Sequence, residues 1–273
     1  KDQQKIFNMG LFETVEPVGT PVGVGKLSLS LTVKEKQSGT VSAGIGFSNR
    51  QQLIGFAQLA ETNFRGMAET VSIRWETGGI TGRSTLELGY VQPWLDPKHT
   101  SLSVQLYDKV FVRFANRLND QVPVGTTTTT QDNRYFEERV GGTVTVGRPF
   151  KENYRADVTL RADNVRANPL ALDSTNSEIL QNVKIASLGG SLVHDTRDLF
   201  LDPVSGYYHS ASLQLGHADI KPIDPSQLTV ANQNVFGSSF FAKTMVELRN
   251  YIPLRGKRKK LDETKPTVAL RTQ

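Results

Sequence analysis

Three charged residues, Asp195, Arg197 and Asp198, stand near the start of the segment HDTRDLFLDPVSGYYHSASLQLG. Such a cluster could act as an acid–base pair or hold a metal ion. The segment then breaks at Pro203 and Gly206, which favour a turn because proline fixes φ and glycine tolerates positive φ. It continues with alternating polar and apolar residues, the pattern of a strand. We therefore interpret it as a charged strand end followed by a turn, in preference to a catalytic loop.

Histidines, cysteines and carboxylates, the residue types that often build catalytic or metal sites, form no recognisable motif in the sequence. The chain has no cysteine, which excludes thiolate nucleophiles, disulfides and cysteine-based metal sites. None of its histidines has the HExxH spacing of a zinc enzyme, and the carboxylates are scattered singly along the chain. We therefore expect no enzyme activity, no metal and no cofactor. The four histidines are His99, His194, His209 and His217.

The basic turn RGKRKK, residues 255–260, concentrates positive charge in a short stretch. Sites for single-stranded nucleic acid usually combine such charge with aromatic residues, and this turn contains none. The whole chain carries a formal net charge of +5 with 22% charged residues, which is a mild excess. We interpret the turn as solvated or facing lipid headgroups, and we expect no nucleic-acid partner.

Charges also recur inside segments that read as strands. In RADVTLRAD, residues 155–163, charged and polar residues alternate with apolar ones, which predicts a strand with one face of each kind. Facing lipid, each charge would cost several kcal/mol near the membrane midplane, whereas inside a wet lumen the charges can pair. The polar face is therefore predicted to line the inside. The predicted lumen-facing charges are Arg155, Asp157, Arg161, Asp163, Lys243, Glu247 and Arg249.

The fold class follows from the number and length of such segments. We count about eleven strands, most about ten residues long, the length at which a tilted strand crosses a bilayer. No run of apolar residues is longer than three, which excludes a transmembrane helix. The chain is thus predicted to be mainly β, an antiparallel transmembrane β-barrel. The expected strands lie near residues 39–48, 52–63, 68–78, 83–93, 99–114, 135–148, 154–165, 183–195, 206–216, 236–252 and 266–273.

The links between these strands support the barrel. Fairly short links interleave with links that are often long, which is typical of barrels with short periplasmic turns and longer outer loops. The alternative is a large soluble β-sandwich, in which the apolar faces point inward. Small residues on the apolar faces suit a barrel wall better. An aromatic and proline girdle at the membrane interface is expected from residues in the short links: Pro93, Trp94, Pro149, Phe150, Tyr251 and Pro253.

The first 38 residues have a different pattern. Residues 2–10 read as the end of a helix with Gly10 as its C-cap. Two strands follow, near residues 12–18 and 26–36, joined by a turn rich in glycine and proline. This order predicts the back half of a small α+β module.

Four segments in order, NMGLFETVEP, LTVKEKQSGTVSAGIGFS, LAETNFRGMAE and DTRDLFLDPVSGYYHSASLQ, resemble the BamA-like outer-membrane assembly proteins, also called the bacterial surface antigen family. The resemblance implies that residues 1–38 are the C-terminal part of the last POTRA module. Residues 39–273 would form the transmembrane β-barrel, incomplete at its C-terminus, with about 11 of 16 strands present. The chain would then be part of a longer protein. The pattern D-x-R-x(5)-P-x-x-G, carried by Asp195, Arg197, Pro203 and Gly206 with Asp198 between them, would be a periplasmic turn facing the lumen.

The resemblance also implies a function. A protein of this family would lie in the cell outer membrane and insert and fold β-barrel clients through a lateral gate, by strand pairing without ATP. Its partners would be unfolded outer-membrane proteins, the lipid bilayer, and periplasmic or lipoprotein accessory subunits bound through the POTRA region. The alternative is a polypeptide-translocating pore of the two-partner secretion, TamA-like or plastid import type. A simple diffusion porin fits less well, because it needs no attached α+β module.

The first barrel strand would be the edge that pairs with a client strand. Its glycines would weaken it by about 0.5–1 kcal/mol each relative to alanine and leave a less committed edge. Alternatively, they merely allow close packing or curvature. The predicted edge residues are Gly39, Val41, Ala43, Gly44, Ile45 and Gly46.

Overall fold

The computed structural model describes Ile6 and residues 10–23, 25–48, 52–79, 81–114, 134–169, 181–199, 202–223, 236–256 and 266–272. Apart from the single helical residue Ile6, the regular structure in these ranges consists of strands. No helix among them is long and apolar enough to cross a membrane. The predicted helix end at residues 2–10 lies, except for Ile6 and Gly10, outside the described residues.

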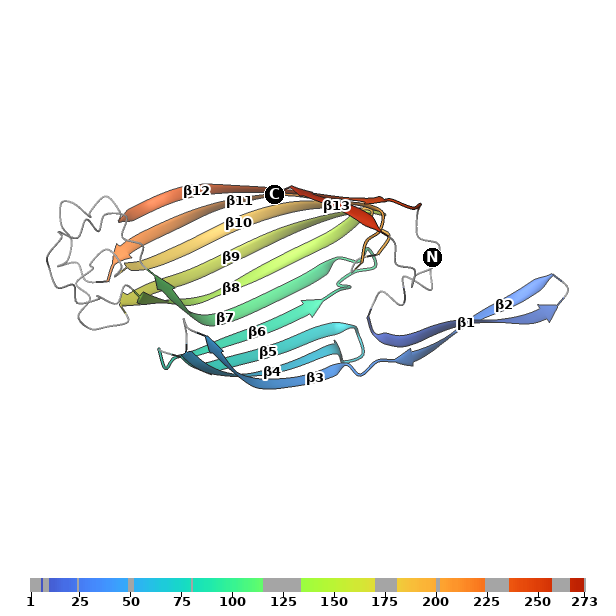
Figure 1. Ribbon diagram of the computed structural model, residues 1–273, viewed down its shortest axis with the longest axis horizontal. Helices are drawn as coiled ribbons and strands as arrows, with labels where there is room; N and C mark the ends of the chain where they lie inside the picture. The colour runs from blue at the N-terminus through green and yellow to red at the C-terminus, as the bar shows by residue number, and fades with distance from the viewer. Residues whose placement is uncertain are drawn as a thin grey trace.

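The described strands form two separate sheets (Figure 1). β1 (Phe12–Gly23) and β2 (Lys26–Glu35) make an antiparallel hairpin, as the sequence predicts. The other strands form one sheet of eleven within the described ranges. These strands are β3 (Gly39–Ser48), β4 (Gln52–Phe64), β5 (Glu69–Gly78), β6 (Ser84–Gln92), β7 (Ser101–Phe114), β8 (Arg134–Lys151), β9 (Tyr154–Pro169), β10 (Gln181–Asp195), β11 (Gly206–Pro222), β12 (Gly237–Pro253) and β13 (Thr267–Thr272).

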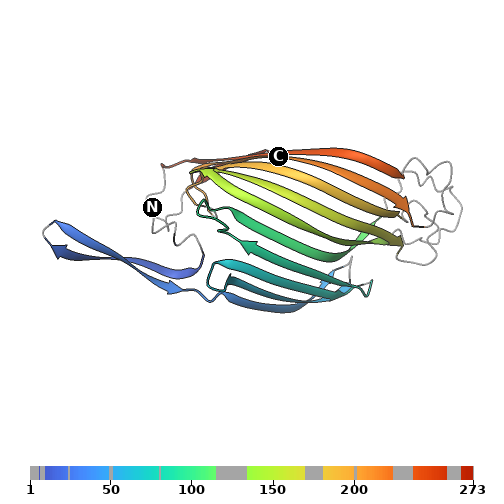
Figure 2. The same cartoon turned by 180° about the vertical axis from the view of Figure 1, so that it is seen from behind.

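Each strand of the large sheet pairs antiparallel with its neighbours in sequence, from β3 at one edge to β13 at the other. The sheet curves into a trough, and Figure 2 shows the same curvature from behind. We call one end of the trough the turn end, where links such as 65–68 and 152–153 join strands and where the hairpin lies. The opposite end, where β7, β9 and β11 finish at Phe114, Pro169 and Pro222, is the loop end.

The two faces of the sheet have opposite polarity, and the apolar face is the exposed one. On β9, Val158 and Leu160 are 52% and 58% exposed, whereas Asp163 on the other face is 6% exposed. The polar face is the concave one, because side chains two strands apart meet on it: the Tyr107 hydroxyl of β7 donates to Asp163 of β9 at 2.6 Å. A soluble sandwich would bury its apolar face, so this arrangement excludes the sandwich alternative. We call the apolar, convex face the outer face.

The hairpin joins the large sheet through a short, hydrogen-bonded segment. The backbone N–H and the hydroxyl of Thr62 both donate to the carbonyl oxygen of Ser38, at 3.1 and 3.2 Å. At the base of the hairpin, the N–H of Lys36 donates to the carbonyl of Leu11 at 2.8 Å. The entry into β3 is therefore fixed against β4. The assignment of residues 1–38 to a POTRA module stays a prediction.

Candidate functional site

The predicted pairing edge lies on β3, at the margin of the large sheet. All six predicted residues, from Gly39 to Gly46, belong to this strand, which pairs with β4 on one side. No other described strand pairs with its second side. Val41 and Ile45 point to the outer face and are 77% and 83% exposed. A strand in this position presents unpaired backbone N–H and C=O groups, which can accept another strand.

The glycines of β3 do not all have the same environment. A Cβ at Gly44 would lie 2.8 Å from the Phe56 ring, which packs over this position on the concave face. The same ring carries the guanidinium of Arg74 at 5.5 Å from its centroid. At Gly46, an added Cβ would make only ordinary contact with Ile54, at 3.6 Å. Close packing therefore accounts for Gly44 but not for Gly46.

Six of the seven predicted lumen-facing charges form ion pairs on the concave face, two residues apart on the same strand. Arg155 and Asp157 lie 2.7 Å apart, and Arg161 and Asp163 lie 2.6 Å apart. On β12, Arg249 and Glu247 pair at 2.7 Å, and Arg271 of β13 joins them at 2.8 Å. Lys243, the seventh, has the same strand parity but makes no ion pair with another described residue.

Hydrogen bonds across β8 connect these pairs to β7. The Arg155 guanidinium donates to the Ser101 hydroxyl at 2.5 Å, and Tyr107 reaches Asp163 in the same way. The strand between them carries Gly147 and Gly141, where an added Cβ would collide with Asp157 and Asp163. Because these positions are glycines, side chains of β7 and β9 can meet across β8. These described residues of the concave face thus form a network of mutually paired charges, which suits a wet lumen better than catalysis.

The segment that opened the sequence analysis folds into one turn between β10 and β11. The carboxylate of Asp195 accepts from the Arg197 guanidinium at 2.6 Å, and this bond raises the pKa of Arg197. Asp198 accepts from the backbone N–H groups of Val204 and Ser205, at 2.9 and 3.1 Å. The structure therefore brings the predicted motif residues, Pro203 and Gly206 included, together in a turn held by their own charges.

A second charged turn, between β4 and β5, was not predicted as a site. The Glu69 side chain has no exposed surface and accepts hydrogen bonds from Arg65 at 2.8 Å and from the Tyr90 hydroxyl at 3.0 Å. Arg65 and Ala68 both adopt left-handed backbone, with φ of 59° and 56°. The segment NFRGMAE shows the Arg–Glu spacing, but only the fold reveals that Tyr90 of β6 covers the carboxylate.

An aromatic and histidine belt crosses the outer face at the turn end of β8–β11. Tyr154 stacks on His194 with ring centroids 3.9 Å apart, and Tyr207 stacks on His209 at 4.6 Å. Phe150, expected in the interface girdle, adjoins Tyr154 at 5.6 Å. Trp94, expected there too, lies at the turn end in the link after β6 and lines a 470 Å³ cleft at the base of the hairpin.

The rest of the outer face between this belt and the loop end is an apolar band. On β10 and β11 its residues alternate with concave-face residues and are roughly half exposed. Among the described residues, no group of three or more histidines and carboxylates lies close enough to hold a metal ion. Exposed large apolar side chains of the band include Val144, Val158, Leu160, Leu188, Leu192, Leu213, Leu215 and Val246.

Comparison with known proteins agrees with this architecture. The model of the Omp85 superfamily domain matches residues 63–265. Among solved structures, the crystal structure of BamA from Haemophilus ducreyi lacking POTRA domains 1–3 superposes with a TM-score of 0.52 at 15% sequence identity. The alignment covers 93% of this chain and 45% of that chain, so the likeness concerns the fold of less than half of that protein.

Proposed function

The chain belongs to the Omp85 superfamily, and from this premise we propose that it forms barrel wall of an outer-membrane protein that inserts and folds β-barrel clients. The observation that carries the proposal is an antiparallel sheet whose apolar face is the exposed one, with β3 at its edge. Lipid tolerates such a face but not unpaired backbone, so the edge must find a strand. We propose that a client strand pairs there through a lateral gate, without ATP.

A weakly held edge supports this reading over a permanently closed seam. Gly46 has no packing reason to be glycine, since an added Cβ there would make only an ordinary contact. Glycine in a strand costs about 0.5–1 kcal/mol relative to alanine. Pairing energy at the seam is therefore lowered where a client would compete for it.

The second candidate function is polypeptide translocation through the lumen. The paired charges of the concave face support it, because a wet wall of both signs presents no apolar surface on which an unfolded chain would adhere. In the first proposed function, accessory subunits bind through the N-terminal module.

The test uses the full-length parent protein in proteoliposomes without nucleotide. We expect an unfolded outer-membrane barrel client to fold faster than in empty liposomes. Because the chain has no cysteine, an engineered disulfide can lock the Ile45→Cys position to the closing strand, and this lock is expected to abolish the acceleration. The control disulfide joins Ser191→Cys and Ser212→Cys, register partners inside the sheet. No acceleration, together with protease-protected uptake of a non-barrel polypeptide, would favour translocation.

A further inference from the structure

A row of polar residues crosses the outer face at the loop end, directly beyond the apolar band. Asn164 of β9 pairs in register with Lys184 of β10 and, on its other side, with Val140, which pairs with Asp108. Register partners project from the same face of a sheet. One step further toward the loop end, Arg166 pairs with Asn182. We call these five polar residues the loop-end rim: Asp108, Asn164, Arg166, Asn182 and Lys184.

Most of the buried side-chain atoms that lack a hydrogen-bond partner in the described part of the chain belong to the loop-end rim. Of the five buried side-chain atoms without a hydrogen-bond partner in the described part of the chain, three are rim oxygens, on Asp108, Asn164 and Asn182. A fourth is Nδ1 of His217, in the adjacent row of the outer face. Buried polar groups of this kind destabilise the protein when they stay unpaired. The rim oxygens can therefore accept hydrogen bonds from a ligand that supplies donors.

The rim also carries cations available to an anion. Arg166 and Lys184 are exposed and make no ion pair with another described residue. Two neighbouring carboxylates are already paired, whereas Asp108 of the rim, on β7, makes no ion pair with another described residue. Glu138 binds Arg83 at 3.0 Å, and Asp219 binds Lys221 at 3.1 Å.

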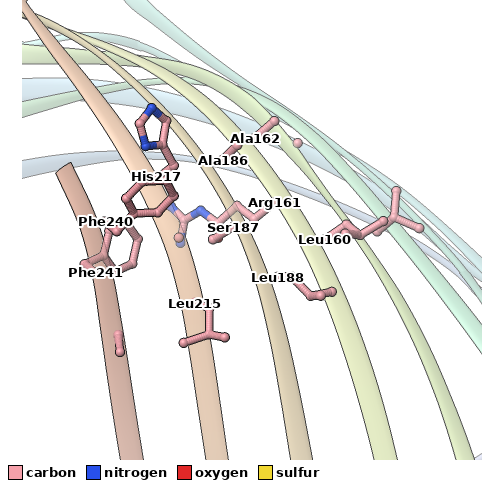
Figure 3. Close-up of a pocket in the computed structure, with 14 residues that line it drawn as sticks. Leu160, Arg161, Ala162, Ala186, Ser187, Leu188, Leu215, His217, Phe240 and Phe241 are labelled. Atoms are coloured by element: carbon pink, nitrogen blue, oxygen red, sulfur yellow. The ribbon is translucent and has the colours of Figure 1, made fainter. Parts of the chain in front are cut away.

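Next to the rim, the apolar band contains a hollow of about 890 Å³ (Figure 3). This volume lies in the range of about 300–1,000 Å³ that ligand sites occupy. A row of small residues, Gly142, Ala162 and Ala186, lies two positions from the rim along β8–β10. Bulkier side chains border it, and Figure 3 shows them around the hollow: Leu160, Leu188, Leu215, His217 and Phe240.

We propose that the hollow and the loop-end rim together bind one phosphorylated glycolipid. An acyl chain fills the hollow, Lys184 and Arg166 bind the phosphate, and sugar hydroxyls donate to the amide oxygens of Asn164 and Asn182. A fully ionised phosphate ester has only acceptor oxygens, so the unsatisfied oxygens favour a headgroup that also carries hydroxyl groups. The inference rests on the proposed membrane location, but not on the client-folding activity.

The test is native mass spectrometry of the full-length protein in a polyoxyethylene detergent, which carries no sugar. Diphosphoryl lipid A, phosphatidylglycerol and phosphatidylcholine are added at equal concentration. We expect lipid A to be retained most strongly and the double variant R166A/K184A to weaken its retention about tenfold or more, since two charge-assisted contacts are lost. The matched control is R148A/K151A, which removes two exposed cations at the turn end and is expected to change nothing.

A second variant examines the hollow. Ala162→Leu fills part of its floor and is expected to reduce lipid A retention, while heat-modifiable mobility on gels reports whether the barrel is folded. Equal retention of phosphatidylglycerol and lipid A would overturn the preference for a sugar headgroup. Equal loss in the R148A/K151A control would overturn the site. If the protein folds clients but retains no lipid preferentially, this inference is wrong and the proposed function stands. If it retains lipid A preferentially but does not accelerate client folding, only the proposed function is wrong.

Discussion

Glu69 and Asp96 show how single carboxylates organise the turn end. Glu69 is fully buried on the outer face, where the Arg65 guanidinium and the Tyr90 hydroxyl satisfy it. Asp96 instead caps an exposed link, accepting from the N–H and the hydroxyl of Thr100 at 3.0 and 2.7 Å. One carboxylate holds two strands and a turn together, and the other shapes a single turn.

Replacing Glu69 by alanine should destabilise the protein by about 1–3 kcal/mol, because it leaves the Tyr90 hydroxyl without its partner and removes the anchor of Arg65. The urea midpoint of the folded protein in lipid vesicles measures this change. The control is Glu13→Ala, which removes an exposed ion pair with Lys34 and should change the midpoint little. A midpoint equally shifted in both variants would contradict the role of burial.

Asp96 gives a pH-dependent prediction. Hydrogen bonds from Thr100, chiefly from its backbone N–H, lower the pKa of Asp96 below its ordinary value. The folded state therefore prefers the charged form. Its stabilising effect is complete above the pKa of the unfolded chain, about 3.9, and is lost as pH falls through the lower folded pKa. Wild type and Asp96→Asn should differ in urea midpoint at pH 7 and converge near pH 2, whereas a difference independent of pH would contradict this account.

At the scale of elements, the turn between β10 and β11 depends on the backbone of Gly206. Its φ of +104° lies outside the range of other residues, and an added Cβ would lie 2.3 Å from the carbonyl oxygen of Thr196. The positive φ and the contact with the Thr196 carbonyl both involve the backbone, so a side-chain rearrangement cannot relieve them.

Gly206→Ala should therefore destabilise the protein by more than about 1 kcal/mol. Thermal or urea unfolding of the folded barrel measures it. Gly190→Ala, in the middle of β10 with no atom within 4 Å of the new Cβ, is the matched control and should be neutral or slightly stabilising. An equal loss in both variants would show that glycine content, not the turn, matters.

Alternation in the sequence predicts the strands well where one face is apolar. The expected strand at 39–48 has the bounds of β3, and the expected start at residue 206 is that of β11. The same rule ends β11 near residue 216, whereas pairing continues to Pro222. Beyond Gly216 the outer face of β11 becomes polar with Asp219 and Lys221, while Ala218 and Ile220 lie on the other face, so the apolar alternation changes phase although the backbone ladder continues. The loop-end bound of β11 was missed for this reason.

Only those features of the candidate site that lie within a single strand could be predicted from the sequence. Charges two residues apart, such as Arg161 and Asp163, face the same side by strand geometry alone, and these two lie 2.6 Å apart. Contacts between strands depend on register, which the sequence does not reveal. The bond from Tyr107 to Asp163, the cover of Tyr90 over Glu69 and the loop-end rim are all of this second kind.

For the whole molecule, the reversed polarity of the sheet makes the outer face sensitive to charge according to depth. Leu188→Arg, in the apolar band, should cost about 2–4 kcal/mol for folding into a bilayer. Leu95→Arg, on a similarly exposed leucine in the link at the turn end, should cost little. Folding yields and urea midpoints in vesicles compare the two variants. Equal effects of both substitutions would contradict a lipid-facing band.

The course of β3 gives the sheet edge a polarity. The strand begins at the turn end with Gly39 and finishes at the loop end with Ser48, and every neighbouring pair in the sheet runs antiparallel. A client strand that extends this antiparallel ladder must run opposite to β3, so that its carboxyl end lies at the turn end. Docking is then vectorial: a segment presented in reverse would have to form a parallel pair that occurs nowhere in the described sheet. The edge would therefore select a client strand by its direction as well as by its side chains.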